Sequence, residues 1–142
     1  MKYLGPDVLK SVYKQRPPES HKGDFGNLLI IGGSNIYTGS PALVAMAALR
    51  AGADLTCIAA PRRAADIAAG FSQNIITCPL VGEVLTERNI NTIMGLLPKY
   101  DAVVIGNGIG LDARTKAAVL KFLRSLKKPC VVDADAIKML VG

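Results

Sequence analysis

The stretch GGSNIYTGSP, from Gly32 to Pro41, combines residue types that suit a site for an anionic ligand. Gly32 and Gly33 allow a sharp turn and a close approach of backbone to ligand. The stretch supplies four hydroxyl groups, from Ser34, Tyr37, Thr38 and Ser40. Pro41 favours the first turn of a following helix, whose free N–H groups attract anions. Two interpretations stay open: a ligand-binding turn, or a tight strand-to-helix connection with Ser40 as N-cap.

A second glycine-rich turn, IGNGIGLD, follows a later apolar run. Gly106, Gly108 and Gly110 alternate along it, and Asn107 lies between the first two. Three glycines in five residues carry an entropic penalty, so a close backbone approach is the favoured explanation. A lone G-x-G-x-G is a weak signal, because a turn without any ligand also uses glycine.

The third candidate is PCVVDADAI, in which Asp133 and Asp135 follow an apolar run. Carboxylates at the end of a strand can hold Mg²⁺ through water. Alternatively, Asp133 is the N-cap of a helix and Asp135 complements the helix dipole in its first turn. The spacing alone favours this second interpretation.

The elements that would position these turns form an alternating series. Nearly continuous apolar runs predict buried strands over 27–32, 54–60, 74–80, 101–106 and 129–133. Helical patterns lie between them, over about 39–52, 61–71, 86–97 and 112–126, and another helix starts at Pro6–Asp7. This alternation predicts one α/β domain over residues 1–142: an open, mostly parallel sheet with helices on both faces. Ligands bind outside the carboxyl ends of strands in such sheets, where all three candidates lie.

Composition narrows the function further. The net charge of +6 is spread along the chain and aromatic residues make up only 5%, which disfavours nucleic acid as a partner. We find no signal peptide and no apolar run long enough to cross a membrane, and therefore expect a cytoplasmic protein without membrane contact. Cys57, Cys78 and Cys130 are far apart, so we expect buried, reduced thiols. His21 is the only histidine, which excludes a multi-histidine metal site.

Taken together and in order, these segments resemble the NAD(P)H-hydrate dehydratase family of the ribokinase-like superfamily. The matching stretches are HKGDFGNLLIIGGSNIYTGSPALVAMAALRAGADL, DAVVIGNGIG and PCVVDADAI, within about residues 20–140. The resemblance implies repair of hydrated NADH or NADPH at the expense of ADP or ATP. The hydroxyl of the hydrate would be phosphorylated, and loss of phosphate would restore the ring double bond. Phosphoryl transfer of this kind depends mainly on positioning and electrostatics, with Mg²⁺ as the usual cation.

The resemblance also assigns site residues. Those expected to contact the hydrated dinucleotide are Tyr37, Thr38, Ser40, Gly106, Asn107, Gly108 and Gly110. Those expected to border the phosphate and cation region are Gly33, Ser34, Asp133 and Asp135. Most members have Ala in place of Ser40 and Pro in place of Asn107, and both departures leave a binding role intact. The resemblance gives no role to His21 or Lys22.

Two further family motifs, H-P-G-E and G-[ST]-G-D, do not occur in these 142 residues. By resemblance, the second supplies the anion hole and the catalytic aspartate. We therefore expect no catalytic residue here, but the substrate-side, N-terminal part of a longer ribokinase-like domain that is inactive alone and belongs to a homo-oligomer. The alternatives are a ribokinase-like kinase of a small alcohol and a noncatalytic binding or assembly module. The choice between ADP and ATP, and between the two hydrates, stays open.

Overall fold

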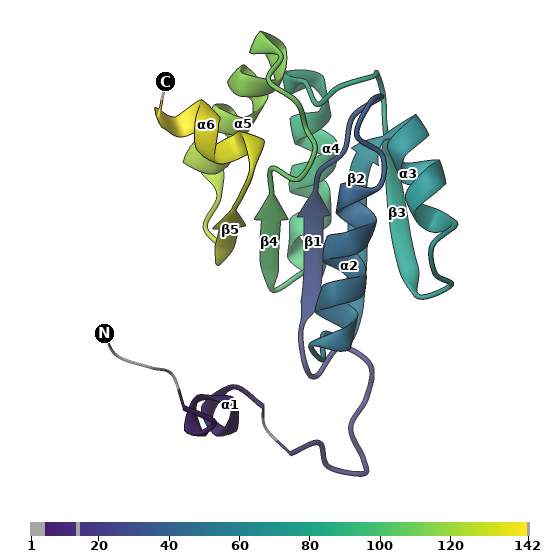
Figure 1. Ribbon diagram of the computed structural model, residues 1–142, viewed down its shortest axis with the longest axis vertical. Coiled ribbons are helices and arrows are strands. Elements are labelled where there is room, and N and C mark those ends of the chain that lie inside the picture. Colours follow the sequence, from purple (N-terminus) through teal and green to yellow (C-terminus); the bar gives the residue numbers. More distant parts are fainter. Residues whose placement is uncertain (1–4, 14, 142) are drawn as a thin grey trace.

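A parallel sheet of five strands forms the centre of the computed structural model, which describes residues 5–13 and 15–141 (Figure 1). The strands are β1 (Asn27–Ile31), β2 (Leu55–Pro61), β3 (Ile75–Leu80), β4 (Ala102–Ile105) and β5 (Cys130–Val132). Their order is β3-β2-β1-β4-β5, and all neighbours are parallel. The predicted α/β class is confirmed, and each strand lies within one or two residues of its predicted range.

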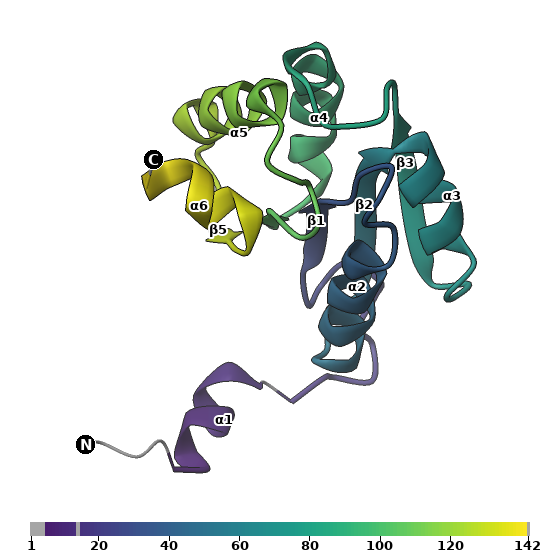
Figure 2. The ribbon, with the colours of Figure 1, turned by 45° about the horizontal axis from the view of Figure 1, so that its top comes forward.

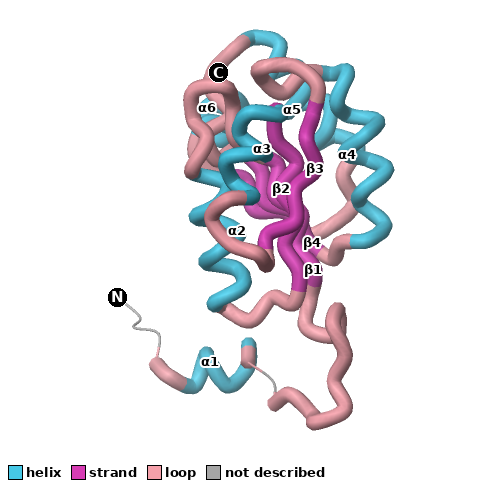
Figure 3. Tube along the Cα trace, turned by 90° about the vertical axis from the view of Figure 1, so that its right-hand side faces the viewer, coloured by secondary structure: helices cyan, strands magenta, loops and turns pink. Residues whose placement is uncertain are grey.

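Helices cover both faces of this sheet, as predicted (Figures 2 and 3). Helices α2 (Ser40–Arg50) and α3 (Arg62–Ala69) lie on one face. Helices α4 (Ile90–Leu96), α5 (Ala113–Ser125) and α6 (Asp135–Val141) lie on the other. The order of strands reverses between β1 and β4, because the chain builds β2 and β3 outward from β1 and then returns to its other side. Such a reversal is where open α/β sheets bind ligands.

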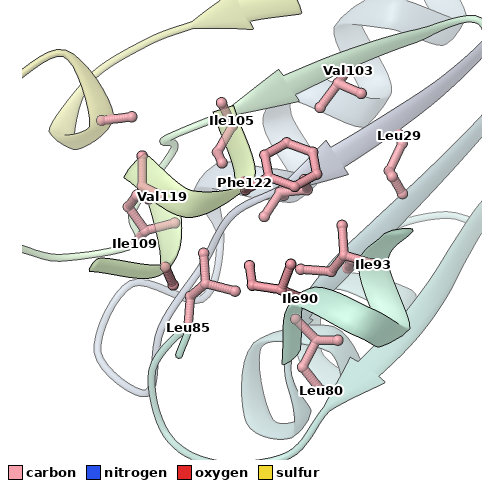
Figure 4. Packing of buried hydrophobic residues seen from close by; sticks show 14 of the residues in the cluster. Leu29, Leu80, Leu85, Ile90, Ile93, Val103, Ile105, Ile109, Val119 and Phe122 are labelled. Atoms are coloured by element: carbon pink, nitrogen blue, oxygen red, sulfur yellow. The ribbon is translucent and has the colours of Figure 1, made fainter. Parts of the chain in front are cut away.

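Alternation along β1 divides the core into two layers. Leu29 and Ile31 point into the layer that contains Phe122 of α5, which Figure 4 shows from close by. Ile30 points into the opposite layer, where Ala42 and Ala45 of α2 pack against the sheet. The strands are hydrophobic at successive positions because both of their faces are buried.

The helix predicted over 86–97 is divided into three parts. A 3-10 turn, η1 (Glu87–Asn89), precedes α4, and a second, η2 (Leu97–Lys99), follows it. Asn89 stabilises the entry, since its Oδ1 accepts the Thr86 N–H at 2.9 Å and its Nδ2 donates to Val81 O at 3.0 Å. Pro98 lies at the start of η2, where a missing N–H is tolerated.

The segment before β1 is tied to the amino end of the sheet through Asp54. This carboxylate accepts the Gly23 N–H, the Phe25 N–H and Arg16 Nη1, each at 2.9 Å. The guanidinium of Arg16 lies 4.2 Å from the centroid of the Phe25 ring. The Phe25 N–H in particular lowers the pKa of Asp54. We call these four residues the Asp54 clasp.

Helix α1 (Asp7–Val12), which begins where the sequence predicts, lies apart from the sheet beyond this clasp (Figure 1). Among the described residues, no helix has the length and apolarity needed to cross a membrane. The three cysteines are free, as expected, but only Cys57 is fully buried, while Cys78 and Cys130 are partly exposed.

Candidate binding site

The two glycine-rich turns meet where the strand order reverses. The first turn leaves the carboxyl end of β1 and the second leaves the carboxyl end of β4. Gly33 N donates to Asn107 O at 2.7 Å, and Gly106 N donates to Ile31 O at 3.1 Å. These hydrogen bonds therefore join two backbone segments that lie more than 70 residues apart in the sequence.

An open cavity of about 790 Å³ lies beside these turns. It is lined by six of the predicted site residues: Ser34, Tyr37, Ser40, Gly108, Gly110 and Asp135. The other predicted residues lie in the same three candidate segments but do not line it: Gly33, Thr38, Gly106, Asn107 and Asp133. The structure thus brings the three candidate segments together at one edge of the sheet.

The first turn is held by Ser34, which is 4% exposed. Its Oγ accepts the Tyr37 N–H at 3.1 Å, and its own N–H donates to Tyr37 O at 3.1 Å. Tyr37 is 55% exposed. Ser34 is therefore occupied in shaping the turn, while the Tyr37 ring stands at the edge of the cavity.

Ser40 is not the N-cap that the sequence suggested. Helix α2 begins at Ser40 itself, and Gly39 takes the N-cap position. The Ser40 hydroxyl is buried and has no hydrogen-bond partner in the described part of the chain. Asn27 and Thr56 also have an unpartnered buried oxygen, but neither lines the cavity. Among the residues with such an oxygen in the described part of the chain, Ser40 is the one that lines the cavity, although its Oγ itself lies covered beside Gly108.

The second turn confirms the close approach inferred from its glycines, but the group approached is the chain itself. A Cβ on Gly106, where φ is +127°, would clash with the carbonyl oxygen of Asp133. A Cβ on Gly108, where φ is +65°, would clash with Ser40 Oγ. Asn107 between them is 7% exposed, and its Oδ1 has no partner among the described residues.

The two aspartates serve this second turn. Asp135 Oδ2 accepts the Gly110 N–H at 3.1 Å, and its Oδ1 accepts Lys138 Nζ at 3.0 Å. Asp133 Oδ2 lies 3.4 Å from Asn107 Nδ2. Helix α6 begins at Asp135, so the suggestion of Asp133 as N-cap is wrong, whereas Asp135 does lie in the first turn.

The aspartates do not form a metal cage. Nowhere in residues 5–13 and 15–141 do three or more His, Cys, Asp or Glu side chains gather as metal ligands would. The carboxylate oxygens of Asp135 are already engaged by Gly110 and Lys138. We therefore assign no step of a reaction to a metal held by these residues.

Sequence reasoning missed three charged residues in the lining: Glu83, Asp112 and Lys138. Glu83 follows β3, and Asn35 N donates to its carbonyl oxygen at 2.8 Å, which joins a third loop to the site. Asp112 is the N-cap of α5 and pairs with Arg114 at 2.8 Å. The Arg114 side chain lowers the pKa of Asp112 to about 2. Only the position of Glu83 after a strand, within VGE, offered a signal in the sequence.

The cavity lies within a stretch of sequence that this chain shares with a known protein family. A sequence profile described as NAD(P)H-hydrate dehydratase matches residues 28–141, which contain every residue of the cavity. The chain belongs to the NAD(P)H-hydrate dehydratase family. The resemblance inferred from the three ordered stretches is thereby confirmed.

Named members of the dehydratase family align along nearly the whole chain. The bifunctional NAD(P)H-hydrate repair enzyme Nnr of Pyrobaculum aerophilum is 42% identical over 141 residues, 98% of this chain and 28% of that protein. The ADP-dependent (S)-NAD(P)H-hydrate dehydratase of Nitrosopumilus maritimus is 37% identical over 96% of this chain and 48% of its own length. The ATP-dependent enzyme of Drosophila melanogaster is 34% identical over 94% and 44%. The chain thus spans about half of these dehydratases and just over a quarter of the bifunctional enzyme.

A solved structure supports the ribokinase-like fold. A ribokinase-like superfamily protein from Enterococcus faecalis superimposes with a TM-score of 0.81 at 25% identity, over 98% of this chain and 47% of that one. The ribokinase-like architecture expected from the sequence is confirmed.

Proposed function

We propose that this chain forms the substrate-side part of an enzyme that dehydrates hydrated NADH or NADPH at the expense of ADP or ATP. The cavity beside the two hydrogen-bonded glycine turns, which Ser40 helps to line, carries this proposal. Its surroundings lie within the matched family region, and relatives carry names with ADP and with ATP. Residues 1–142 then represent the N-terminal part of a longer ribokinase-like domain.

The cavity wall suits the uncharged part of a nucleotide. Its lining carries three carboxylates, from Glu83, Asp112 and Asp135, against the single ammonium group of Lys138. Asp112 is paired with Arg114 and Asp135 with Lys138, so the wall carries little net charge and accommodates a ring and hydroxyl groups. In our proposal the Tyr37 ring packs beside the hydrated ring, and Ser40 Oγ exchanges a hydrogen bond with a substrate hydroxyl or amide.

The chemistry then needs groups that these residues do not provide. Phosphorylation of the hydroxyl converts it to a leaving group, and loss of phosphate together with a ring proton restores the double bond. The chain's own task is to hold and orient the hydrate and to exclude water. Residues 1–142 alone are accordingly proposed to be without turnover, because the G-[ST]-G-D stretch is absent from them.

Incubation of the full-length protein with each hydrate, and with ADP or ATP, tests the function. We expect nucleotide-dependent recovery of the absorbance of the reduced nicotinamide. A stable phosphorylated small alcohol formed without that recovery would establish a ribokinase-like kinase instead. If the protein neither restores the reduced nicotinamide nor consumes the nucleotide, the noncatalytic module is favoured.

We also propose that the protein is a cytoplasmic homo-oligomer. Helix α2 is almost entirely apolar, and the side chain of its Leu43 is 72% exposed. An exposed apolar side chain on such a helix supports a contact between copies of the chain. Light scattering of the purified protein should give a mass above that of one chain. Cell fractionation should recover the protein in the cytosolic fraction. A monomer at micromolar concentration would contradict the first of these statements.

A further inference from the structure

We propose that Asp135 is a positioning residue, which fixes the Gly106–Gly110 turn in its binding shape by holding the Gly110 amide. The inference rests on the proposed function of the cavity and is argued from the hydrogen bond between the Asp135 carboxylate and the Gly110 amide. Asp135 Oδ2, at the start of α6, accepts the N–H of Gly110 in the second turn at 3.1 Å. Both residues line the cavity.

The turn needs such an anchor at its far end. Its near end is held by the bond from Gly106 N to Ile31 O and by Asn107 O, which accepts Gly33 N. Ile109 is completely buried in the core layer below. Gly110, in contrast, has φ of +74° and no atom within 4 Å of the place where a Cβ would stand. Side-chain packing therefore contributes nothing at Gly110, and the Asp135 bond fixes its backbone.

Lys138 keeps the carboxylate in place. Its Nζ pairs with Asp135 Oδ1 at 3.0 Å, so each carboxylate oxygen has one donor. The Asp135 side chain is only 16% exposed, whereas that of Lys138 is 64% exposed. A charged acceptor in such a sheltered place makes a stronger hydrogen bond to an amide than a neutral one does. Helix α6 is thereby coupled to the wall of the cavity.

A positioning role predicts a defined pattern of effects. Without the anchor, the free turn would sample several backbone conformations, and ordering it again would weaken ligand binding. The Michaelis constant for the hydrate should rise about tenfold in Asp135→Ala, as expected for a lost hydrogen bond to a charged group, while kcat changes less than about twofold. Asp135→Asn keeps an acceptor oxygen for Gly110 and should recover most of the affinity.

The experiment measures hydrogen–deuterium exchange of the peptide that spans residues 106–111, together with steady-state kinetics, in the full-length protein. We expect Asp135→Ala to accelerate exchange in this peptide and Asp135→Asn to restore slow exchange. Asp66→Ala, which removes an exposed carboxylate from α3 outside the cavity, is the matched control and should change neither readout. Asp135→Ser retains a residue that suits a helix start but is too short to reach Gly110, and serves if the alanine variant does not fold.

Unchanged exchange in both Asp135→Ala and Asp135→Ser would overturn the proposal. So would a raised Michaelis constant in Asp135→Asn with exchange as slow as in the parent, because Asp135 would then act on the substrate directly. The exchange measurement needs no substrate. If the parent protein shows no dehydration, the proposed function fails while the anchor is still decided by exchange.

Discussion

At the amino end of the sheet the carboxylate of Asp54 has three hydrogen-bond donors, whereas at the carboxyl end the buried hydroxyl of Ser40 has none among the described residues. The Asp54 clasp is complete in itself and is explained by stability alone. An unpartnered buried hydroxyl costs stability unless a ligand or water supplies the partner. The contrast fits a structural role for the first region and, in our proposal, a binding role for the second.

Gly106→Ala should have the largest effect on stability. The new Cβ would clash with the Asp133 carbonyl oxygen at a φ of +127°, and we expect a loss of about 3 kcal/mol. Urea unfolding of the full-length protein measures it. The matched control is Gly95→Ala in α4, where no atom lies within 4 Å; its stability should be unchanged or up to about 1 kcal/mol higher. Equal losses in both variants would refute the packing account of this turn.

Asp54→Ala should come next and should affect stability without affecting the cavity. It leaves the Gly23 and Phe25 amides and the Arg16 guanidinium without their shared acceptor. We expect a melting temperature several degrees lower, with the affinity for the hydrate unchanged after refolding at low temperature. Calorimetry and a binding titration check the two parts. A weakened affinity in the folded variant would break the separation between the two ends.

Acid should weaken the protein through these same carboxylates. The pKa of Asp54 is lowered from its ordinary 3.8, chiefly by the Phe25 amide, and Arg114 lowers the pKa of Asp112 to about 2. The stability contributed by a depressed pKa is complete above the ordinary value and is lost as the pH falls through the folded value. The temperature at the midpoint of unfolding should therefore decrease as the pH is lowered from about 4 to about 2. Asp54→Asn should flatten this decline, and an identical decline in that variant would show that the clasp contributes nothing to it.

Ser40→Ala should have the smallest effect on stability and a distinct one on binding. Removal of an unpartnered hydroxyl should leave the free energy of unfolding within about 0.5 kcal/mol of the parent or raise it. Affinity for the hydrate should fall about threefold to tenfold, as for one neutral hydrogen bond. Calorimetric titration with the hydrate measures the fall. Undiminished affinity would mean that Ser40 shapes the turn without contacting the ligand.

Much of the fold was predictable because the nearly continuous hydrophobicity of a buried strand is a local pattern. The composition of the run NLLII predicts β1, and the glycines that follow it mark the carboxyl end of the strand. The exact helix starts were not predictable, since Ser40 and Asp133 both have the chemistry of an N-cap and neither occupies one. The side chains of Ser40 and Asp133 instead lie against the second glycine-rich turn. The order of strands in the sheet brings this turn beside them.

The glycines of the cavity wall and Asp135 were predictable from the sequence, but its other charged residues, Glu83, Asp112 and Lys138, were not. Glu83 reaches the cavity because Asn35 binds its carbonyl oxygen, and these residues are far apart in sequence. Lys138 enters the lining because α6 packs beside the second turn. Long-range pairings of this kind leave no local pattern, whereas positive-φ turns require glycine and so mark themselves.

A crystal structure of the full-length protein with hydrated NADH tests the central claim most directly. We predict the hydrated ring in the cavity between Tyr37 and the Gly108–Gly110 turn, with Ser40 Oγ within hydrogen-bond distance of the ligand. Binding of the hydrate elsewhere, for example near the Asp54 clasp, with this cavity left to water would contradict the account.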